Sequence, residues 1–212
     1  MSETPPIRTA VYIDGFNLYH RLLQNSPYKW LDVKKLCQLL LKPYNHITSV
    51  KYFTAMVSGR TDVNQPIRQK TYLRAMKHHI PELSVYFGSF QTHPKTARLV
   101  TPVNGTKYVE VYKTEEKGSD VNLAVHLLND AWLDAYDSAV LISNDSDIAE
   151  ALRLVRINHP SKTLGLISPV DYPSAELKKH VHYIKKIRKG VLEASQLPDP
   201  IPGTTLTKPS IW

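Results

Sequence analysis

The chain has 212 residues, of which 42% are hydrophobic and 22% are charged, values that are ordinary for a folded protein and exclude a disordered or collagen-like chain. A chain of this length fits one medium domain and can bury a continuous core without disulfides or metal staples. Lys and Arg number 27 against 19 Asp and Glu, and the resulting net charge of +8 is consistent with a polyanionic partner without identifying one.

Cysteine content and hydropathy limit the cellular compartments in which we expect the protein. The single cysteine, Cys37, excludes an intramolecular disulfide framework and a Cys-rich zinc module, and it favours a reducing compartment. The first residues, MSETPPIRTA, lack the apolar segment of a secretory signal. No apolar run reaches the roughly 20 residues that span a bilayer. We therefore expect a cytoplasmic protein without a membrane partner.

The first half of the chain alternates between strand and helix patterns. Apolar, β-branched and aromatic runs predict strands, and apolar residues at helical spacing predict helices. In chain order we expect a strand over 8–14, helices over 17–24 and 31–41, a strand over 47–57, a helix over 62–79 and a strand over 83–90. Residues 91–108, with two prolines and a glycine, form the least regular stretch.

The second half continues the alternation. We expect a helix over 118–135 with Ser119 as its N-cap, a strand over 137–143, a helix over 145–157, a strand over 163–168 and a helix over 173–193. Four prolines in the segment after 194 predict an extended tail that hangs off the domain. The alternative is that its last residues, SIW, dock on the protein. The predicted organisation is a short extension over 1–7, one domain over 8–193 and a Pro-rich tail over 194–212.

Strands that alternate with helices imply right-handed crossovers. The predicted fold class is therefore α/β, with a mostly parallel central sheet covered by helices on both faces.

Aspartates gather where this fold places ligands, at the carboxyl ends of the strands. Asp14 and Asp145 each follow a buried apolar run, and Asp120 opens the helix that leads into the strand over 137–143. That helix runs antiparallel to the strand, so its first residue lies over the same sheet edge. Three carboxylates are thus expected to converge, with Asp147 as a fourth.

Each aspartate alone has a simpler interpretation, because Asp commonly caps the first turn of a helix. The set is different, since three or four carboxylates at one edge repel one another unless a cation neutralises them. Carboxylates without His or Cys favour Mg²⁺ or Mn²⁺. Such an ion orients a phosphoryl group and activates water, which indicates phosphate ester hydrolysis.

Other phosphate-handling sites fit the sequence less well. A haloacid-dehalogenase-type phosphatase needs a second Asp where Phe16 stands, and neither a P-loop nor a GxGxxG dinucleotide motif occurs. A toprim-like site is matched by Asp145-Ser-Asp147 but needs Glu in place of Asp14.

Three segments together resemble the signature segments of NYN domains, the LabA-like branch of the PIN-like nuclease superfamily. They are AVYIDGFNLY at 10–19, EEKGSDVNLA at 115–124 and AVLISNDSD at 139–147. The resemblance covers about residues 8–190 and implies a PIN-like three-layer sandwich and an Mg²⁺- or Mn²⁺-dependent endoribonuclease. By the same resemblance Asp14, Asp120 and Asp145 are metal ligands, Asp147 is a further acidic residue, and Asn17 supports the first Asp or contacts the scissile phosphate.

The sequence departs from the family pattern in two places. Many PIN domains carry an acidic residue on the helix after the second strand, where this chain has only Asp62 at the start of the helix. Some relatives carry a Cys-rich insertion before the acidic helix, whereas residues 91–114 contain no cysteine and are expected to form a bare loop or hairpin.

Basic residues provide candidate contacts to RNA phosphates. Leu177, Val181, Ile184, Ile187 and Val191 predict an apolar helical stripe, flanked by Lys178, Lys185, Lys186 and Lys189 as a track for RNA. A merely solvated helix face is the alternative. Lys117 is a candidate for the scissile phosphate or a solvated loop lysine, and residues 91–113 interleave cations with Tyr108 and Tyr112, as suits base stacking.

The sequence thus favours an endoribonuclease with RNA as its partner and 5′-phosphate and 3′-hydroxyl products. The alternatives are a non-catalytic RNA-binding or interaction module on the same fold, a phosphatase, and a nuclease acting on single-stranded DNA. The sequence leaves the oligomeric state open.

Overall fold

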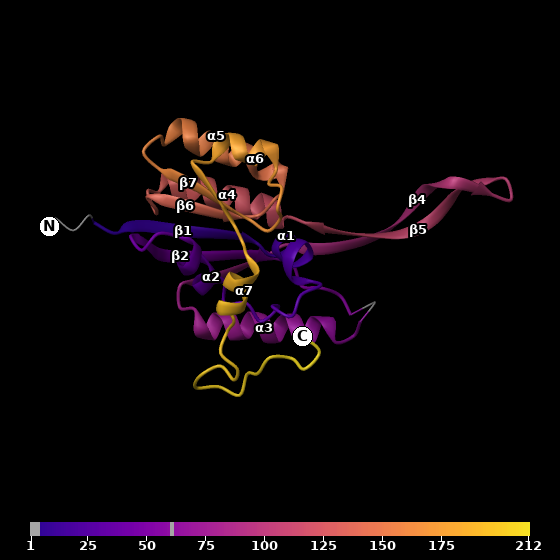
Figure 1. The fold of residues 1–212 in the computed structure, drawn as a ribbon. Coiled ribbons are helices and arrows are strands. Elements are labelled where there is room, and N and C mark those ends of the chain that lie inside the picture. The colour runs from indigo at the N-terminus through magenta and orange to yellow at the C-terminus, as the bar shows by residue number, and fades with distance from the viewer. Residues whose placement is uncertain (1–4, 60–61) are drawn as a thin grey trace.

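A six-stranded parallel sheet forms the centre of the protein, seen here in a computed structural model that describes residues 5–59 and 62–212. The strand order is β3-β2-β1-β6-β7-β8 (Figure 1). The strands are β1 (Ile7–Asp14), β2 (Asn45–Thr54), β3 (Leu83–Phe87), β6 (Ser138–Ile142), β7 (Thr163–Ser168) and β8 (Tyr183–Lys186).

Strand β1 lies in the middle of the sheet because both of its faces are apolar. Val11 and Ile13 belong to one core cluster, and Ala10 and Tyr12 belong to the other. The strand pairs in parallel with β2 on one side and with β6 on the other. A continuous apolar run is what a strand covered on both faces requires.

Helices cover both faces, so the protein has three layers (Figure 1). One face carries α1 (Gly15–Leu18), a π-helical turn (Tyr19–Leu23), α2 (Val33–Leu40), α3 (Gln65–His79) and α7 (Lys189–Ala194). The other carries α4 (Ser119–Trp132), the 3₁₀ turn η2 (Ser146–Ile148), α5 (Ala149–Asn158) and α6 (Ala175–His180). The predicted α/β class with a mostly parallel sheet is confirmed. Within the described residues, no helix combines the length and hydropathy needed to cross a membrane.

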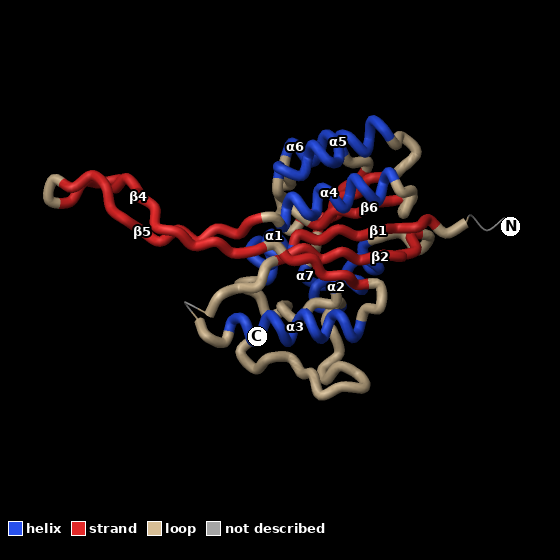
Figure 2. The backbone as a smooth tube through the Cα atoms, turned by 180° about the vertical axis from the view of Figure 1, so that it is seen from behind, coloured by secondary structure: helices blue, strands red, loops and turns tan. Residues whose placement is uncertain are grey.

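Residues 89–117 form a long antiparallel hairpin, which we call the arm, and it projects from the body (Figure 2). It consists of β4 (Ser89–Val103) and β5 (Thr106–Lys117). The turn at Asn104 and Gly105 has positive φ at both residues, 48° and 79°, as a two-residue hairpin turn requires. Of the two expectations for this region, the hairpin is therefore correct and the irregular loop is wrong. The following helix is capped by Gly118 in the left-handed region rather than by Ser119.

The predicted helix over 173–193 is wrong. The segment divides into α6, the edge strand β8 and α7. Its apolar residues do not form one stripe, since Leu177 and Val181 pack into the cluster on one face of the sheet, while Ile187 and Val191 pack against the cluster on the other. The track of lysines on a single helix face therefore does not exist.

The C-terminal segment docks on the domain instead of hanging off it. Leu197 and Ile201 are buried in the core cluster beneath α2 and α3. The indole nitrogen of Trp30 donates a hydrogen bond to the Pro198 carbonyl at 3.1 Å, and the ring of Trp212 packs edge-on against Trp30 at 6.3 Å. Burial of these apolar side chains offsets the conformational entropy lost by a segment without regular structure.

The docked segment leads to a prediction about stability. Ile201 is 1% exposed, so Ile201→Ala should lower the free energy of unfolding by about 2 to 4 kcal/mol. Ile211 in the same segment is 73% exposed, and Ile211→Ala should change it by less than about 0.5 kcal/mol. Urea denaturation of both variants measures the difference. Equal effects of the two substitutions would show that the segment does not dock in solution.

Candidate active site

Three aspartates from three separate elements line one cavity at the carboxyl edge of the sheet. Asp14 ends β1, Asp145 follows β6, and Asp120 lies in the first turn of α4. Because β1 and β6 are neighbouring parallel strands, their ends meet at this edge. We call Asp14, Asp120 and Asp145 the carboxylate cluster. The cavity is also lined by Phe16, Asn17, His20, Arg21, Phe90, Glu116 and Ser119.

Ser143 connects two members of the carboxylate cluster. Its buried hydroxyl donates to Asp14 Oδ2 at 2.9 Å and accepts from the backbone N–H of Asp145 at 3.0 Å. Asp14 Oδ1 accepts from the backbone N–H of Asn17 at 2.9 Å, and so Asp14 also caps α1. Asp145 in turn accepts from the Asp147 N–H at 3.0 Å and caps η2. The capping role expected of single aspartates is therefore correct for Asp14 and Asp145 and wrong for Asp120, whose helix is capped by Gly118.

Asn17 holds the loop that carries Asp145. Its side-chain oxygen accepts from the backbone N–H of Asn144 at 3.0 Å. The side-chain oxygen of Asn144 accepts in turn from the N–H of Ser174 at 2.7 Å, just before α6. These bonds tie α1, the loop after β6 and the start of α6 to one another. Asn17 thus positions the loop beside the carboxylate cluster.

The third carboxylate shares one hydroxyl with a residue that the sequence analysis assigned no role. Ser119 Oγ lies 2.9 Å from Glu116 Oε2 and 3.0 Å from Asp120 Oδ1. A hydroxyl has one proton to donate, so it cannot satisfy both carboxylates fully. The backbone N–H of Ser119 adds a bond to Glu116 Oε1 at 3.1 Å, which leaves Asp120 the less neutralised of the two. A cation or a proton at this point would relieve their repulsion.

Burial, with a smaller contribution from the charges of Asp145 and Asp120, raises the pKa of Asp14 to about 6, although the hydrogen bonds from Asn17 and Ser143 oppose the shift. An all-oxygen set under this repulsion suits a hard divalent ion. Among residues 5–59 and 62–212, no three His, Cys, Asp or Glu side chains are arranged to enclose an ion, so the three carboxylates do not form a complete metal site in this structure.

Several predicted site residues do not reach this cavity. Asp147 is exposed in η2 and is not among the described residues that line the cavity. Lys117 ends the arm, where its ammonium lies 3.1 Å from Glu115. Lys178 is exposed on α6 and Lys189 on α7. Lys185 and Lys186 are consecutive on β8 and point to opposite faces, so of the two only Lys186 lies with Arg21 and Asp171 beside the sheet edge of the site.

Ser143 and Glu116 are functional candidates that sequence reasoning missed. Ser143 directly precedes Asn144-Asp145 at the end of a strand, and this position is a signal for a site residue. Glu116 lies within the EEKGSD segment, four residues before Asp120. Neither residue type at these positions is distinctive, and only the fold shows that Ser143 bonds to Asp14 and that Glu116 shares the Ser119 hydroxyl with Asp120.

Comparisons with known proteins show the family and the fold of the chain. The NYN domain family matches residues 8–188. The chain is 33% identical over 242 aligned positions to 6-hydroxy-3-succinoylpyridine 3-monooxygenase HspA of Pseudomonas putida, an alignment covering 99% of this chain and 77% of that protein. A crystal structure of a protein of unknown function from Vibrio parahaemolyticus has the same fold, with a TM-score of 0.58, 14% identity, and coverage of 89% of this chain and 98% of that one.

The raised pKa of Asp14 leads to a prediction about pH and stability. Folding raises it from 3.8 to about 6, so ionised Asp14 destabilises the fold and stability is lost as pH rises through this range. In EDTA at pH 7, Asp14→Asn should raise the free energy of unfolding by about 1 to 3 kcal/mol. At pH 4 wild-type Asp14 is mostly protonated, and the gain should nearly vanish.

Denaturant titrations at the two pH values measure the gain. Glu150→Gln is the control, because Arg153 lowers the pKa of Glu150 and its neutralisation brings no gain. A destabilised Asp14→Asn at pH 7, or the same gain at both pH values, would contradict the assignment.

Proposed function

This chain belongs to the NYN domain family, within the PIN-like nuclease superfamily, and we propose that it is a divalent-metal-dependent endoribonuclease. One observation carries the proposal: Asp14, Asp120 and Asp145, from three elements, line a single cavity at the carboxyl edge of the sheet. A purely structural set of helix caps has no reason to converge, because convergence adds repulsion.

In this proposal the residues of the cavity bind and orient. Asp14, Asp120 and Asp145 would hold Mg²⁺ or Mn²⁺, which supplies charge stabilisation at the phosphate and an activated water. Ser143 fixes the relative position of Asp14 and Asp145 through its two hydrogen bonds. Glu116 restrains Ser119 at the start of α4, beside Asp120. Addition of water to phosphorus with cleavage of the P–O3′ bond leaves 5′-phosphate and 3′-hydroxyl ends.

The arm supports RNA as the substrate. Residues 91–109 contain Lys95, Arg98 and Lys107 and no Asp or Glu. The strand register places Arg98 opposite Tyr108, on the same face as Tyr112, which is 82% exposed. A two-stranded hairpin with exposed faces is marginally stable alone. Bases stacked on the tyrosines and phosphates at the cations would stabilise it.

The base of the arm lies at the cavity of the carboxylate cluster, where a substrate contact is needed. Phe90 at the start of β4 and Glu116 near the end of β5 both line the cavity of the carboxylate cluster. A strand of RNA bound along the arm would therefore lead to that cavity.

A second candidate function comes from the similarity to the Pseudomonas enzyme, which covers nearly the whole chain. This candidate is hydroxylation of a hydroxypyridine ring, with dioxygen as oxidant and a two-electron donor as reductant. One oxygen atom would enter the ring and the other would leave as water. Incubation with a hydroxypyridine, NADH and dioxygen, with measurement of oxygen uptake, separates this candidate from RNA cleavage.

The nuclease proposal predicts that substitution of two neighbouring aspartates has different effects on the rate of RNA cleavage. Asp145→Asn should lower the rate of RNA cleavage by at least about 100-fold, because Asp145 lines the cavity. Asp147→Asn should lower it by less than about tenfold, since its exposed side chain lies outside the cavity. Both rates are measured with end-labelled RNA in Mn²⁺, with EDTA as the blank and the product ends mapped.

Circular dichroism of the two variants controls for folding. Cleavage by Asp145→Asn at the wild-type rate, in nuclease-free preparations, would show that the cluster is not the active site. A single-stranded DNA substrate of the same sequence tests the DNA alternative.

The arm predicts a change in the salt dependence of binding. Replacing Lys95, Arg98 and Lys107 with Gln removes up to three phosphate contacts, each worth about 0.7 in the slope of log affinity against log salt. The triple variant should bind single-stranded RNA more weakly at low salt, with a slope shallower by about 2. Turnover at saturating RNA should change little, because the carboxylate cluster is untouched. Filter binding across a salt series gives the slope.

A matched control removes the same charge elsewhere. Lys70, Arg74 and Lys77 are exposed on α3, and their triple Gln variant should keep the wild-type slope. Equal slopes for wild type and the arm variant would show that RNA does not follow the arm.

A further inference from the structure

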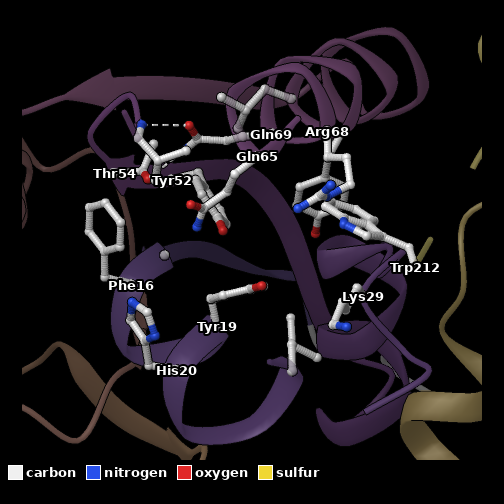
Figure 3. Close-up of a pocket in the computed structure, with 15 residues that line it drawn as sticks. Phe16, Tyr19, His20, Lys29, Tyr52, Thr54, Gln65, Arg68, Gln69 and Trp212 are labelled. Carbon is white, nitrogen blue, oxygen red and sulfur yellow. Dashed lines mark hydrogen bonds between the residues drawn. The ribbon is translucent and has the colours of Figure 1, made fainter. Parts of the chain in front are cut away.

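A second cavity lies next to the carboxylate cluster, and aromatic side chains dominate its walls. Its volume is about 80 Å³, and it is partly open to solvent, so a bound molecule would extend beyond the enclosed part. Figure 3 shows Phe16 and His20 at one end and Lys29, Arg68 and Trp212 at the other, with Tyr19, Tyr52 and Gln65 between them. We call it the aromatic cavity.

Tyr52 gives this cavity a polar group that faces open space. The residue is 6% exposed, and its hydroxyl, which bonds to no other residue in the described part of the chain, is not among the fully buried atoms that lack a partner, so water in the cavity can reach it. Gln65 lines the same cavity, and its amide likewise bonds to no residue in the described part of the chain. Cavities that serve packing alone are apolar, whereas the hydroxyl of Tyr52 and the amide of Gln65 are groups to which a ligand or water in the cavity would bond.

The opposite end of the cavity is positively charged. The ammonium of Lys29 has no ion-pair or hydrogen-bond partner within residues 5–59 and 62–212. Arg68 is 17% exposed and pairs with Asp62 at the cavity edge. Arg68 is therefore largely neutralised, and Lys29 is the cation available to an anion that enters the cavity.

The aromatic cavity and the carboxylate cluster share a wall. Phe16 and His20 line both cavities, and their rings stack at 6.1 Å with an interplanar angle of 13°. Gly15, directly after Asp14, lies against the Tyr52 ring so closely that an added Cβ would come within 2.5 Å of it. The two rings therefore form part of the wall between the aromatic cavity and the carboxylate cluster.

We propose that the aromatic cavity binds a small planar aromatic anion, its ring between Phe16 and Tyr72 with a polar ring atom at the Tyr52 hydroxyl, and its anionic group at Lys29. The repulsion from the carboxylate cluster directs the anionic group to the far end and leaves a ring edge toward Phe16 and His20. The site is a feature of the cavity itself and does not depend on the proposed nuclease activity. The ring and anion belong either to a free heteroaromatic acid or to a nucleotide, and binding experiments distinguish these sources.

The test measures binding to the intact protein without any turnover. Calorimetry uses 6-hydroxynicotinate as the aromatic acid, uridine monophosphate as the nucleotide, cyclohexanecarboxylate as a non-planar acid and 2-hydroxypyridine as a ring without an anion. At least one of the first two probes should bind saturably at one site per chain. The last two should bind at least about tenfold more weakly, because each lacks the ring or the charge.

Two variants locate the bound molecule. Tyr52→Phe should weaken binding about fivefold, the loss of one hydrogen bond, without lowering Tm, since the hydroxyl has no described protein partner. Lys29→Gln should weaken binding of the aromatic anion about fivefold to tenfold and leave 2-hydroxypyridine unaffected. Lys35→Gln, an exposed lysine on α2, is the matched control and should bind as wild type.

The outcomes separate the sources and the alternatives. Binding of 6-hydroxynicotinate alone identifies a free aromatic acid, and binding of uridine monophosphate identifies a nucleotide. No saturable binding of either at millimolar concentration would overturn the proposal, and so would affinities that neither Tyr52→Phe nor Lys29→Gln changes. RNA cleavage is measured separately, so loss of this site and loss of the nuclease proposal are distinguishable.

Discussion

The local structure around the site depends on holding like charges together at one sheet edge. Ser143 and the backbone N–H of Asn17 stabilise the Asp14 carboxylate, yet burial and neighbouring charges still raise its pKa to about 6. The surrounding fold therefore supports an arrangement that is unfavourable on its own. The same aspartates cap α1 and η2, so the elements next to the site begin where the charges are.

The sequence predicts the parallel sheet well because its strands are buried on both faces. The strand over 163–168 agrees with β7 at both ends, and β1 is extended by only Ile7. The arm is different, since most of its side chains are exposed on both faces and no alternation of apolar and polar residues marks it as strand. The local sequence signal for the hairpin is Asn104-Gly105, a dipeptide typical of two-residue hairpin turns.

In the C-terminal region, the helical spacing of apolar residues predicts the wrong secondary structure. Leu177, Val181, Ile187 and Val191 have helical spacing, but α6 and α7 are short and lie on opposite faces of the sheet, with the edge strand β8 between them. When each element contributes one or two apolar residues, helical spacing arises by coincidence. The tail docks because Leu197 and Ile201 find a core whose position the local sequence does not contain.

The same limit applies to the two cavities. Aspartates at strand ends are readable in sequence, because parallel strands bring their ends to one edge. The aromatic cavity combines Phe16 from α1, Arg68 from α3 and Trp212 from the docked segment, which only the tertiary fold brings together. Phe16 and His20 then separate a negative cavity from one whose far end is positive. A ligand with an aromatic ring and an anionic group can satisfy both ends in only one orientation, with the ring toward the carboxylates and the anion toward Lys29.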